Sequence, residues 1–179
     1  MRRNDRLYSN MVVAVMVAAL AVVAPFVLPV GPVPVSLCTF LIYLLAFVLG
    51  RRAAAAVLVY VLLGMAGLPV FAGFAGGAGT VLGPTGGYIF GYLPLAWLSG
   101  RAVERFPARR WVQMVAFTSG TLILYLLGTA WYCFQTGTEP AAAAVLCVLP
   151  FLPGDLAKIV VAGIVGPLLR RRLEQAELI

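Results

Sequence analysis

Apolar stretches about as long as a lipid bilayer is thick fill most of this sequence, and short clusters of arginine separate them. A membrane-spanning helix needs roughly 20 mainly apolar residues. Of the 179 residues, 63% are hydrophobic and 11% are charged, whereas soluble domains carry about 25% charged residues. One globular core cannot bury so much apolar surface. We therefore expect an all-α integral membrane protein that forms a single domain over residues 1–179.

The apolar stretches divide into six expected transmembrane helices. They cover residues 11–28, 35–49, 53–68, 84–99, 111–131 and 153–169, the last one ending at the arginines at 170–172. A short apolar piece, residues 141–149, precedes the sixth helix. The first stretch follows Arg2, Arg3 and Arg6 as the core of a secretory signal would, but it is longer than such a core usually is. We therefore interpret it as a retained helix.

The positions of the arginines test this division into six helices. The chain has 13 Lys and Arg residues, and all except Lys158 are arginines. They lie before the first expected helix, between the second and third, between the fourth and fifth, and after the sixth. Six spans place all four clusters on one side of the membrane, whereas five or seven would scatter them. The positive-inside rule then predicts that both termini are cytoplasmic.

The connection between the third and fourth helices is rich in glycine and carries aromatic residues. Residues 69–79 read PVFAGFAGGAG and contain no charge. Irregular backbone at membrane depth is tolerated where it is buried in protein or lines a cavity. A plain linker is the simpler alternative, although a linker is normally polar. We favour a lid or pocket wall, with Phe74 as a candidate wall residue.

Two charged residues stand where the sixth helix begins. Lys158 is the only lysine of the chain, and Asp155 precedes it by three residues, so both can share one helix face. A charge at a helix centre costs about 2.5–3.5 kcal/mol on insertion scales. In a purely structural role, Asp155 would cap the helix and Lys158 would snorkel or pair with it. A lysine near a helix N-terminus opposes the helix dipole, however. We therefore favour a ligand-binding role for both.

A second candidate site is the run Gly83-Pro84-Thr85-Gly86-Gly87-Tyr88 at the start of the fourth helix. Its glycines would let a ligand approach the backbone, and N–H groups at a helix start are free to donate. Thr85, Gly86, Gly87 and Tyr88 are therefore candidate substrate contacts. The run lacks the Lys and Ser/Thr of a nucleotide-binding P-loop. A generic turn is the alternative.

Ala14 and Ala18 on the first helix are a candidate surface for close packing of another helix. Small residues four positions apart allow a second helix to pack closely. The chain contains many alanines, so coincidence is the alternative explanation.

The sequence offers little for catalysis or metal binding. It contains no histidine, and its three cysteines show no CxxC spacing, so neither a zinc site nor a disulfide framework is expected. Serine–histidine chemistry is excluded, and the six acidic residues lie mostly in tails and loops. An intramembrane enzyme using the Asp155–Lys158 pair for proton transfer remains an alternative. A scaffold subunit would not need this pair.

Four segments occur in an order that resembles one known family. They read VPVSL at 33–37, GLPVFAG at 67–73, LGPTGGY at 82–88 and PFLPGDLAK at 150–158. The series is similar to the biotin-specific membrane subunit of energy-coupling factor transporters, the BioY family, over essentially the whole chain. The resemblance implies six helices in the cell membrane of a prokaryote and capture of external biotin at the outer face.

The resemblance also implies partners. The alanine surface of the first helix would dock on a transmembrane coupling protein that is bound to two ATPase subunits. The chain would not be an enzyme and would need no cofactor of its own, because ATP is used by the partner subunits. A binding subunit for another vitamin or a precursor is the alternative within transport.

Three positions depart from the family pattern. Related sequences often carry glutamine where this chain has Cys38, some carry a polar residue near Ala75, and some carry an arginine where Ile89 stands. An arginine at position 89 is thus not available for the biotin carboxylate. Polar contacts should then fall on Asp155, Lys158 and backbone groups. Lys158 could donate to the ureido oxygen or to the tail carboxylate, and the sequence leaves this open.

Overall fold

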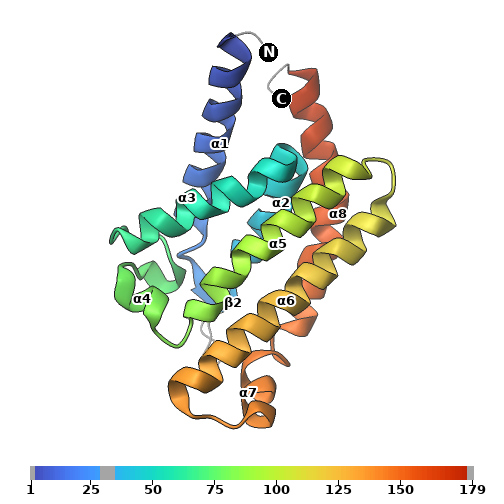
Figure 1. Ribbon diagram of the computed structural model, residues 1–179. Coiled ribbons are helices and arrows are strands. Elements are labelled where there is room, and N and C mark those ends of the chain that lie inside the picture. Colours follow the sequence, from blue (N-terminus) through green and yellow to red (C-terminus); the bar gives the residue numbers. More distant parts are fainter. Residues whose placement is uncertain (1–2, 29–34, 177–179) are drawn as a thin grey trace.

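The computed structural model describes residues 3–28 and 35–176, which form a bundle of helices (Figure 1). The helices are α1 (Arg3–Val23), α2 (Cys38–Leu49), α3 (Ala53–Met65), α4 (Ala78–Leu82), α5 (Gly86–Arg105), α6 (Arg110–Thr136), α7 (Pro140–Cys147) and α8 (Leu152–Gln175). Two 3₁₀ turns, η1 (Gly50–Arg52) and η2 (Ala72–Phe74), and two short strands, β1 (Val27–Leu28) and β2 (Val35–Ser36), complete the described elements.

Helices α5 and α6 pack along most of their length as an antiparallel pair (Figure 1). Each helix provides a glycine opposite a leucine of the other. A Cβ built on Gly91 would lie 2.7 Å from Leu124 Cδ1, and one built on Gly120 would lie 2.7 Å from Leu95 Cδ1. Because neither glycine has a side chain, the two backbones approach closely and the leucines fill the gaps. This pair forms one wall of the site described below.

A buried aromatic cluster fills the bundle between α2, α6 and α8. Tyr43 stacks on Phe117 with ring centroids 4.9 Å apart, and Phe47 meets the same ring edge-on at 5.5 Å. Gly166 of α8 leaves room for Phe47, since an added Cβ would lie 2.0 Å from its ring. The Tyr43 hydroxyl is hydrogen-bonded to Thr121 at 2.5 Å. The cluster fills the bundle between the site and the end of the molecule that carries the arginines.

Three arginine-bearing parts of the chain, namely η1, the turn between α5 and α6 and the last part of α8, lie toward one end of the molecule, where the N- and C-termini also lie (Figure 1). Arg51 donates from its backbone N–H and from Nε to Glu104 Oε2, at 3.0 Å each, which joins η1 to the end of α5. Arg170 pairs with Glu174 at 2.8 Å and donates to the carbonyl of Phe47 at 3.3 Å. This arrangement agrees with the predicted grouping of the arginine clusters.

Three helical stretches of the described residues are long and apolar enough to cross a membrane. They are Cys38–Met65, Arg110–Thr136 and Leu152–Gln175, and Asn10–Val23 is a shorter apolar helix. The first stretch runs through η1, where Gly50 has φ +55° and ψ −131° and interrupts the helical path. The helical class is thus confirmed, and the count of six spans stays a prediction.

Several predicted boundaries were wrong. Helix α1 ends at Val23 rather than at residue 28, because Pro25 follows and residues 27–28 pair with β2 in the register Val27↔Ser36. The glycine-rich connection 69–83 contains η2 and α4, so it is only partly irregular. Helices α5 and α6 extend past their predicted ends at residues 99 and 131, to Arg105 and Thr136. Residues 29–34 of the proline-rich connection lie outside the described part.

The connection between α1 and α2 contacts the connection between α3 and α4. The Gly73 N–H donates to the carbonyl of Pro25 at 2.9 Å, and the ring of Phe26 meets that of Phe74 edge-on at 5.2 Å. Phe74 has φ +60°, a conformation that residues other than glycine rarely adopt. The chain between α1 and α2 and the chain between α3 and α4 therefore meet at this point.

Candidate functional site

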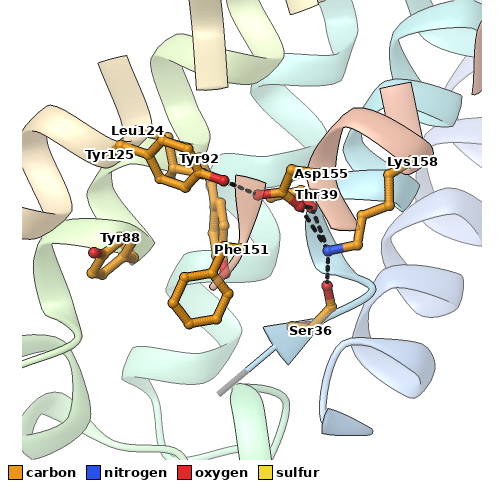
Figure 2. A pocket seen from close by; sticks show the side chains of 9 residues that line it. All are labelled: Ser36, Thr39, Tyr88, Tyr92, Leu124, Tyr125, Phe151, Asp155 and Lys158. Atoms are coloured by element: carbon orange, nitrogen blue, oxygen red, sulfur yellow. Dashed lines mark hydrogen bonds and ion pairs between the residues drawn. The ribbon is translucent and has the colours of Figure 1, made fainter. Parts of the chain in front are cut away.

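Two adjoining cavities open between the helices on the side away from the arginines. Including the parts open to solvent, they measure about 420 Å³ and about 610 Å³, within the range of small-molecule sites. We call them the polar and the apolar cavity. Both are lined by Ser36, Tyr88 and Tyr92, so they share a boundary. The polar cavity is also lined by Thr39, Leu124, Tyr125, Phe151, Asp155 and Lys158 (Figure 2).

Asp155 is the centre of the hydrogen-bond network that lines the polar cavity (Figure 2). Its side chain is buried, and both carboxylate oxygens accept hydrogen bonds. Oδ1 accepts from Lys158 Nζ at 2.8 Å and from Thr39 Oγ1 at 3.3 Å, and Oδ2 accepts from the hydroxyl of Tyr125 at 2.5 Å. A carboxylate can accept about four hydrogen bonds. Oδ2 thus retains the capacity to accept one further N–H from a ligand.

Lys158 has three acceptors around its ammonium group. Besides Asp155, Nζ donates to the carbonyl of Ser36 at 2.7 Å and to Thr39 Oγ1 at 3.3 Å. An ammonium has three N–H donors, so each donor has a partner without a ligand. The side chain is nevertheless 13% exposed and lines the polar cavity. A ligand oxygen can therefore reach Nζ by sharing or replacing one of these partners.

In a purely structural role, Asp155 would cap α8 and Lys158 would pair with it, and the structure shows only the second of these contacts. Asp155 does not cap α8, because its own N–H already donates to Phe151 O at 2.8 Å and its carboxylate contacts α2 and α6. Lys158 does pair with it, as that alternative proposed. The network joins α8 to β2, α2 and α6, so it stabilises the bundle as well as lining the cavity.

Tyr88 stands between the two cavities and holds the end of α7. Its hydroxyl donates to the carbonyl of Cys147 at 3.1 Å and lies 3.3 Å from Thr129 Oγ1. Its ring lies over Gly128, where an added Cβ would be 2.4 Å from the ring. Thr85 lines the apolar cavity. Both residues, which the sequence analysis named as candidate substrate contacts, therefore line a cavity.

Three other predicted contacts lie outside the two cavities. A Cβ built on Gly86 would be 1.8 Å from Val81 O, and one on Gly87 would be 2.3 Å from Trp131 Cβ. These glycines permit close packing of α5 on α4 and α6. Phe74 is exposed. The glycine-rich connection still forms a wall of the apolar cavity, through Phe71, Ala72, Ala75 and Thr80.

Sequence reasoning missed most of the uncharged lining of the polar cavity. These residues come from β2, α2, α5 and α6 and from the turn before α8, and they are Ser36, Thr39, Tyr92, Leu124, Tyr125 and Phe151. The available signal was a threonine or tyrosine within an otherwise apolar helix. The three positions that depart from the family pattern, Cys38, Ala75 and Ile89, all line the apolar cavity.

Ala14 and Ala18 lie on the exposed face of α1, together with Met11 and Val15. The opposite face of α1 packs through Val17 and the other buried residues of the helix. The predicted docking surface is thus uncovered in the isolated chain.

Comparison with known proteins gives a consistent result. The model of the BioY family matches residues 2–175. "Biotin transporter BioY" of Thermotoga maritima is 41% identical over 155 residues, which cover 86% of this chain and 90% of the relative. "Biotin transporter BioY2" of Lactococcus lactis subsp. cremoris is 33% identical over 172 residues, covering 96% and 94%.

A solved structure has the same fold. It is the crystal structure of the S-component for biotin from an ECF-type ABC transporter, and it matches with a TM-score of 0.88 and 26% identity over 96% of this chain and 95% of the other. The matched relatives are transporters rather than enzymes. From the extent of the family match and the identity to these relatives, we conclude that this chain belongs to the BioY family.

Proposed function

We propose that this chain is the substrate-specific subunit of an energy-coupling factor transporter and that it captures biotin in the two adjoining cavities for uptake across the cell membrane. The observation that carries the proposal is the buried Asp155–Lys158 pair, whose carboxylate can accept one further hydrogen bond within a cavity of ligand size. The names of the relatives and of the structural match support biotin as the ligand.

The chemistry of biotin suits this site. Its ureido ring offers two N–H donors and a carbonyl acceptor, its thiophane ring is apolar, and its tail ends in a carboxylate. Asp155 Oδ2 would accept a ureido N–H, and Lys158 would donate to the ureido oxygen or to the tail carboxylate. Aromatic rings of Tyr88, Tyr92 and Phe151 provide apolar contact for the ring system.

Biotin that stays bound during purification tests this proposal. We expect mass spectrometry of the protein, purified in mild detergent, to detect biotin near one molecule per chain. The Asp155→Asn variant should carry much less under the same conditions, because it removes the acceptor on which the site depends. A competition panel with other vitamins and labelled biotin is the control. Equal displacement by an unrelated vitamin would contradict the assignment of substrate.

We further propose six transmembrane helices with both termini in the cytoplasm. The gathering of the arginine clusters at one end, with the cavities away from that end, supports this topology. Helix α1, the two halves of Cys38–Met65 separated at Gly50, α5, α6 and α8 would be the spans. The coupling protein and the ATPase subunits would then act from the side of the arginines.

Cysteine labelling from outside the cell tests the topology. Gly77 is a poor site for substitution because its φ is +86°, whereas an added Cβ at Gly79 meets nothing within 4 Å. We expect Gly79→Cys and Glu139→Cys to react with an impermeant thiol reagent in intact cells, and Ala108→Cys to react only after lysis. The partly exposed Cys133 should first be replaced by serine. Labelling of Ala108→Cys alone in intact cells would show the inverted orientation.

A further inference from the structure

Four arginines surround the turn between α5 and α6 and are absent from the proposed site. Arg101 and Arg105 lie one turn apart on the last part of α5, and Arg109 and Arg110 begin α6. We call residues 101–110 the arginine turn. All four side chains are exposed. Within residues 3–28 and 35–176, none of the four takes part in an ion pair, whereas Arg51 and Arg170 each have a glutamate partner.

Two of these charges stand where the fold does not favour them. A helix N-terminus carries a partial positive charge, so a cation there is destabilising and an anion is stabilising. Arg109 is the N-cap residue of α6 and Arg110 is its first residue. The first turn of α6 contains no acidic residue, and no side chain caps it. Helix α6 therefore provides no negative group that would offset the positive charge of Arg109 and Arg110 at its N-terminus. By contrast, Arg105 stands at the favourable C-terminal end of α5.

The arginine turn is held in one shape by a buried glutamine. Gln113 Nε2 donates to the carbonyl of Phe106 at 2.9 Å and to that of Pro107 at 3.3 Å. The backbone N–H of Arg109 also donates to Phe106 O, at 3.1 Å. These bonds occupy turn carbonyls that would otherwise present negative charge outward. The backbone of the turn is thus fixed, and its exposed arginines make its surface positive.

Tryptophans flank this surface. Trp97 and Trp111 are both exposed, and the guanidinium of Arg101 lies 5.4 Å from the centre of the Trp97 ring. Tryptophan prefers the interface between lipid tails and headgroups. An arginine held over such a ring would therefore lie at headgroup depth.

We propose that the arginine turn is a binding site for the headgroup of an anionic phospholipid. A phosphodiester would receive hydrogen bonds from guanidinium groups and charge compensation from the N-terminus of α6. The surface is positive and flanked by tryptophans, so it complements a negatively charged lipid surface. Each arginine near such a surface contributes a similar favourable energy to lipid binding. Under the proposed topology, the lipid belongs to the cytoplasmic leaflet.

The native tryptophans provide the assay. The whole chain is reconstituted in phosphatidylcholine vesicles that contain a rising fraction of phosphatidylglycerol brominated on its acyl chains, and quenching of tryptophan fluorescence is followed. Brominated phosphatidylcholine at the same fractions gives the reference. We expect preferential quenching by phosphatidylglycerol. In Arg109→Gln/Arg110→Gln the preference should fall by at least about fivefold, and by about 30-fold if both charges act independently.

The matched control is Arg171→Gln/Arg172→Gln, which removes the same charge from an exposed position at the same end of the molecule. This control should keep the preference, and both variants should keep biotin binding. Equal losses in the two variants would mean a diffuse effect of net charge and would overturn the proposal. Absence of any preference in the wild type would overturn it too. If Arg109→Gln/Arg110→Gln kept the lipid preference and lost only assembly with the energising subunits, the arginine turn would instead bind a protein partner. Vesicles expose both leaflets to the same lipid, so the result does not depend on the proposed topology.

Discussion

Asp155→Asn is expected to weaken biotin binding by about 1–3 kcal/mol or more, the cost of leaving buried polar groups without partners. Asparagine keeps one oxygen that can accept from Lys158 and Thr39, but its NH2 group replaces the oxygen that accepts from the Tyr125 hydroxyl and would accept from the ligand. Lys158→Met should cause a loss of similar size, since it leaves the carboxylate without its cation. Isothermal titration with biotin, on purified chain from which co-purified biotin has been removed, measures both losses.

The two losses should not add. Thr39 contacts both Asp155 and Lys158, so all three belong to one hydrogen-bonded network. Removing either charge already disrupts the environment of the other, and the double variant should therefore lose less than the sum of the single variants. Neither change should prevent membrane insertion, because each lowers the charge carried by α8. Wild-type affinity in the double variant would mean that the pair is structural only.

The chain offers a matched control for this experiment. Arg170 and Glu174 also form an ion pair on α8, at 2.8 Å, but their side chains are 35% and 48% exposed. Exposed pairs of this kind contribute little. Glu174→Gln should therefore leave biotin affinity unchanged within error. A loss comparable to that in Asp155→Asn would show that the assay reports general damage to α8.

Biotin methyl ester distinguishes the two roles left open for Lys158. If Nζ binds the tail carboxylate, the ester should bind the wild type poorly and lose little more in Lys158→Met. If Nζ instead donates to the ureido oxygen, the substitution should weaken free biotin and the ester alike. The contact of Nζ with the carbonyl of Ser36 shows that it already serves a neutral carbonyl oxygen, at 2.7 Å.

Ala14→Trp and Ala18→Trp are each expected to abolish association with the coupling protein and to leave biotin binding by the isolated subunit intact. Both alanines are exposed on α1 and line neither cavity. An indole ring at either position prevents the close helix approach that small residues allow. Co-purification of the tagged coupling protein and biotin titration of the free subunit provide the two measurements.

Leu126→Trp is the matched control for docking. Leu126 is 70% exposed on α6 and also faces away from the bundle, but it belongs to a different helix. The same ring placed there should permit normal assembly. If Ala14→Trp and Ala18→Trp assemble as well as the control, helix α1 is not the docking surface.

The sequence was sufficient for the features that depend on charge in an apolar background. Lys158 and Asp155 were identifiable because a charge within an apolar helix is costly and needs a partner. Their spacing placed them on one face, and the structure brings their charged atoms to 2.8 Å. The grouping of the arginines likewise followed from their alternation with apolar segments.

The rest of the site depends on contacts between residues far apart in the chain. Thr39 and Tyr125 reach Asp155 across sequence separations of 116 and 30 residues, and nothing local marks either residue as a partner. Gly86 and Gly87 illustrate a related point. A glycine that admits a ligand and a glycine that gives room to a neighbouring element look the same in sequence, and only the packed helices show that these two lie against Val81 and Trp131.

The contact between the α1–α2 connection and the α3–α4 connection has a kinetic consequence. Pro25 and Phe26 are held to Gly73 and Phe74 by one hydrogen bond and one ring contact, and the chain segments on both sides, including Ala24 and Ala72, line the apolar cavity. Passage of a ligand between these segments requires them to separate first. Association that awaits such a change is slower than diffusional encounter. Biotin should therefore enter at a rate that levels off as its concentration rises, and once the segments have closed again it should leave slowly.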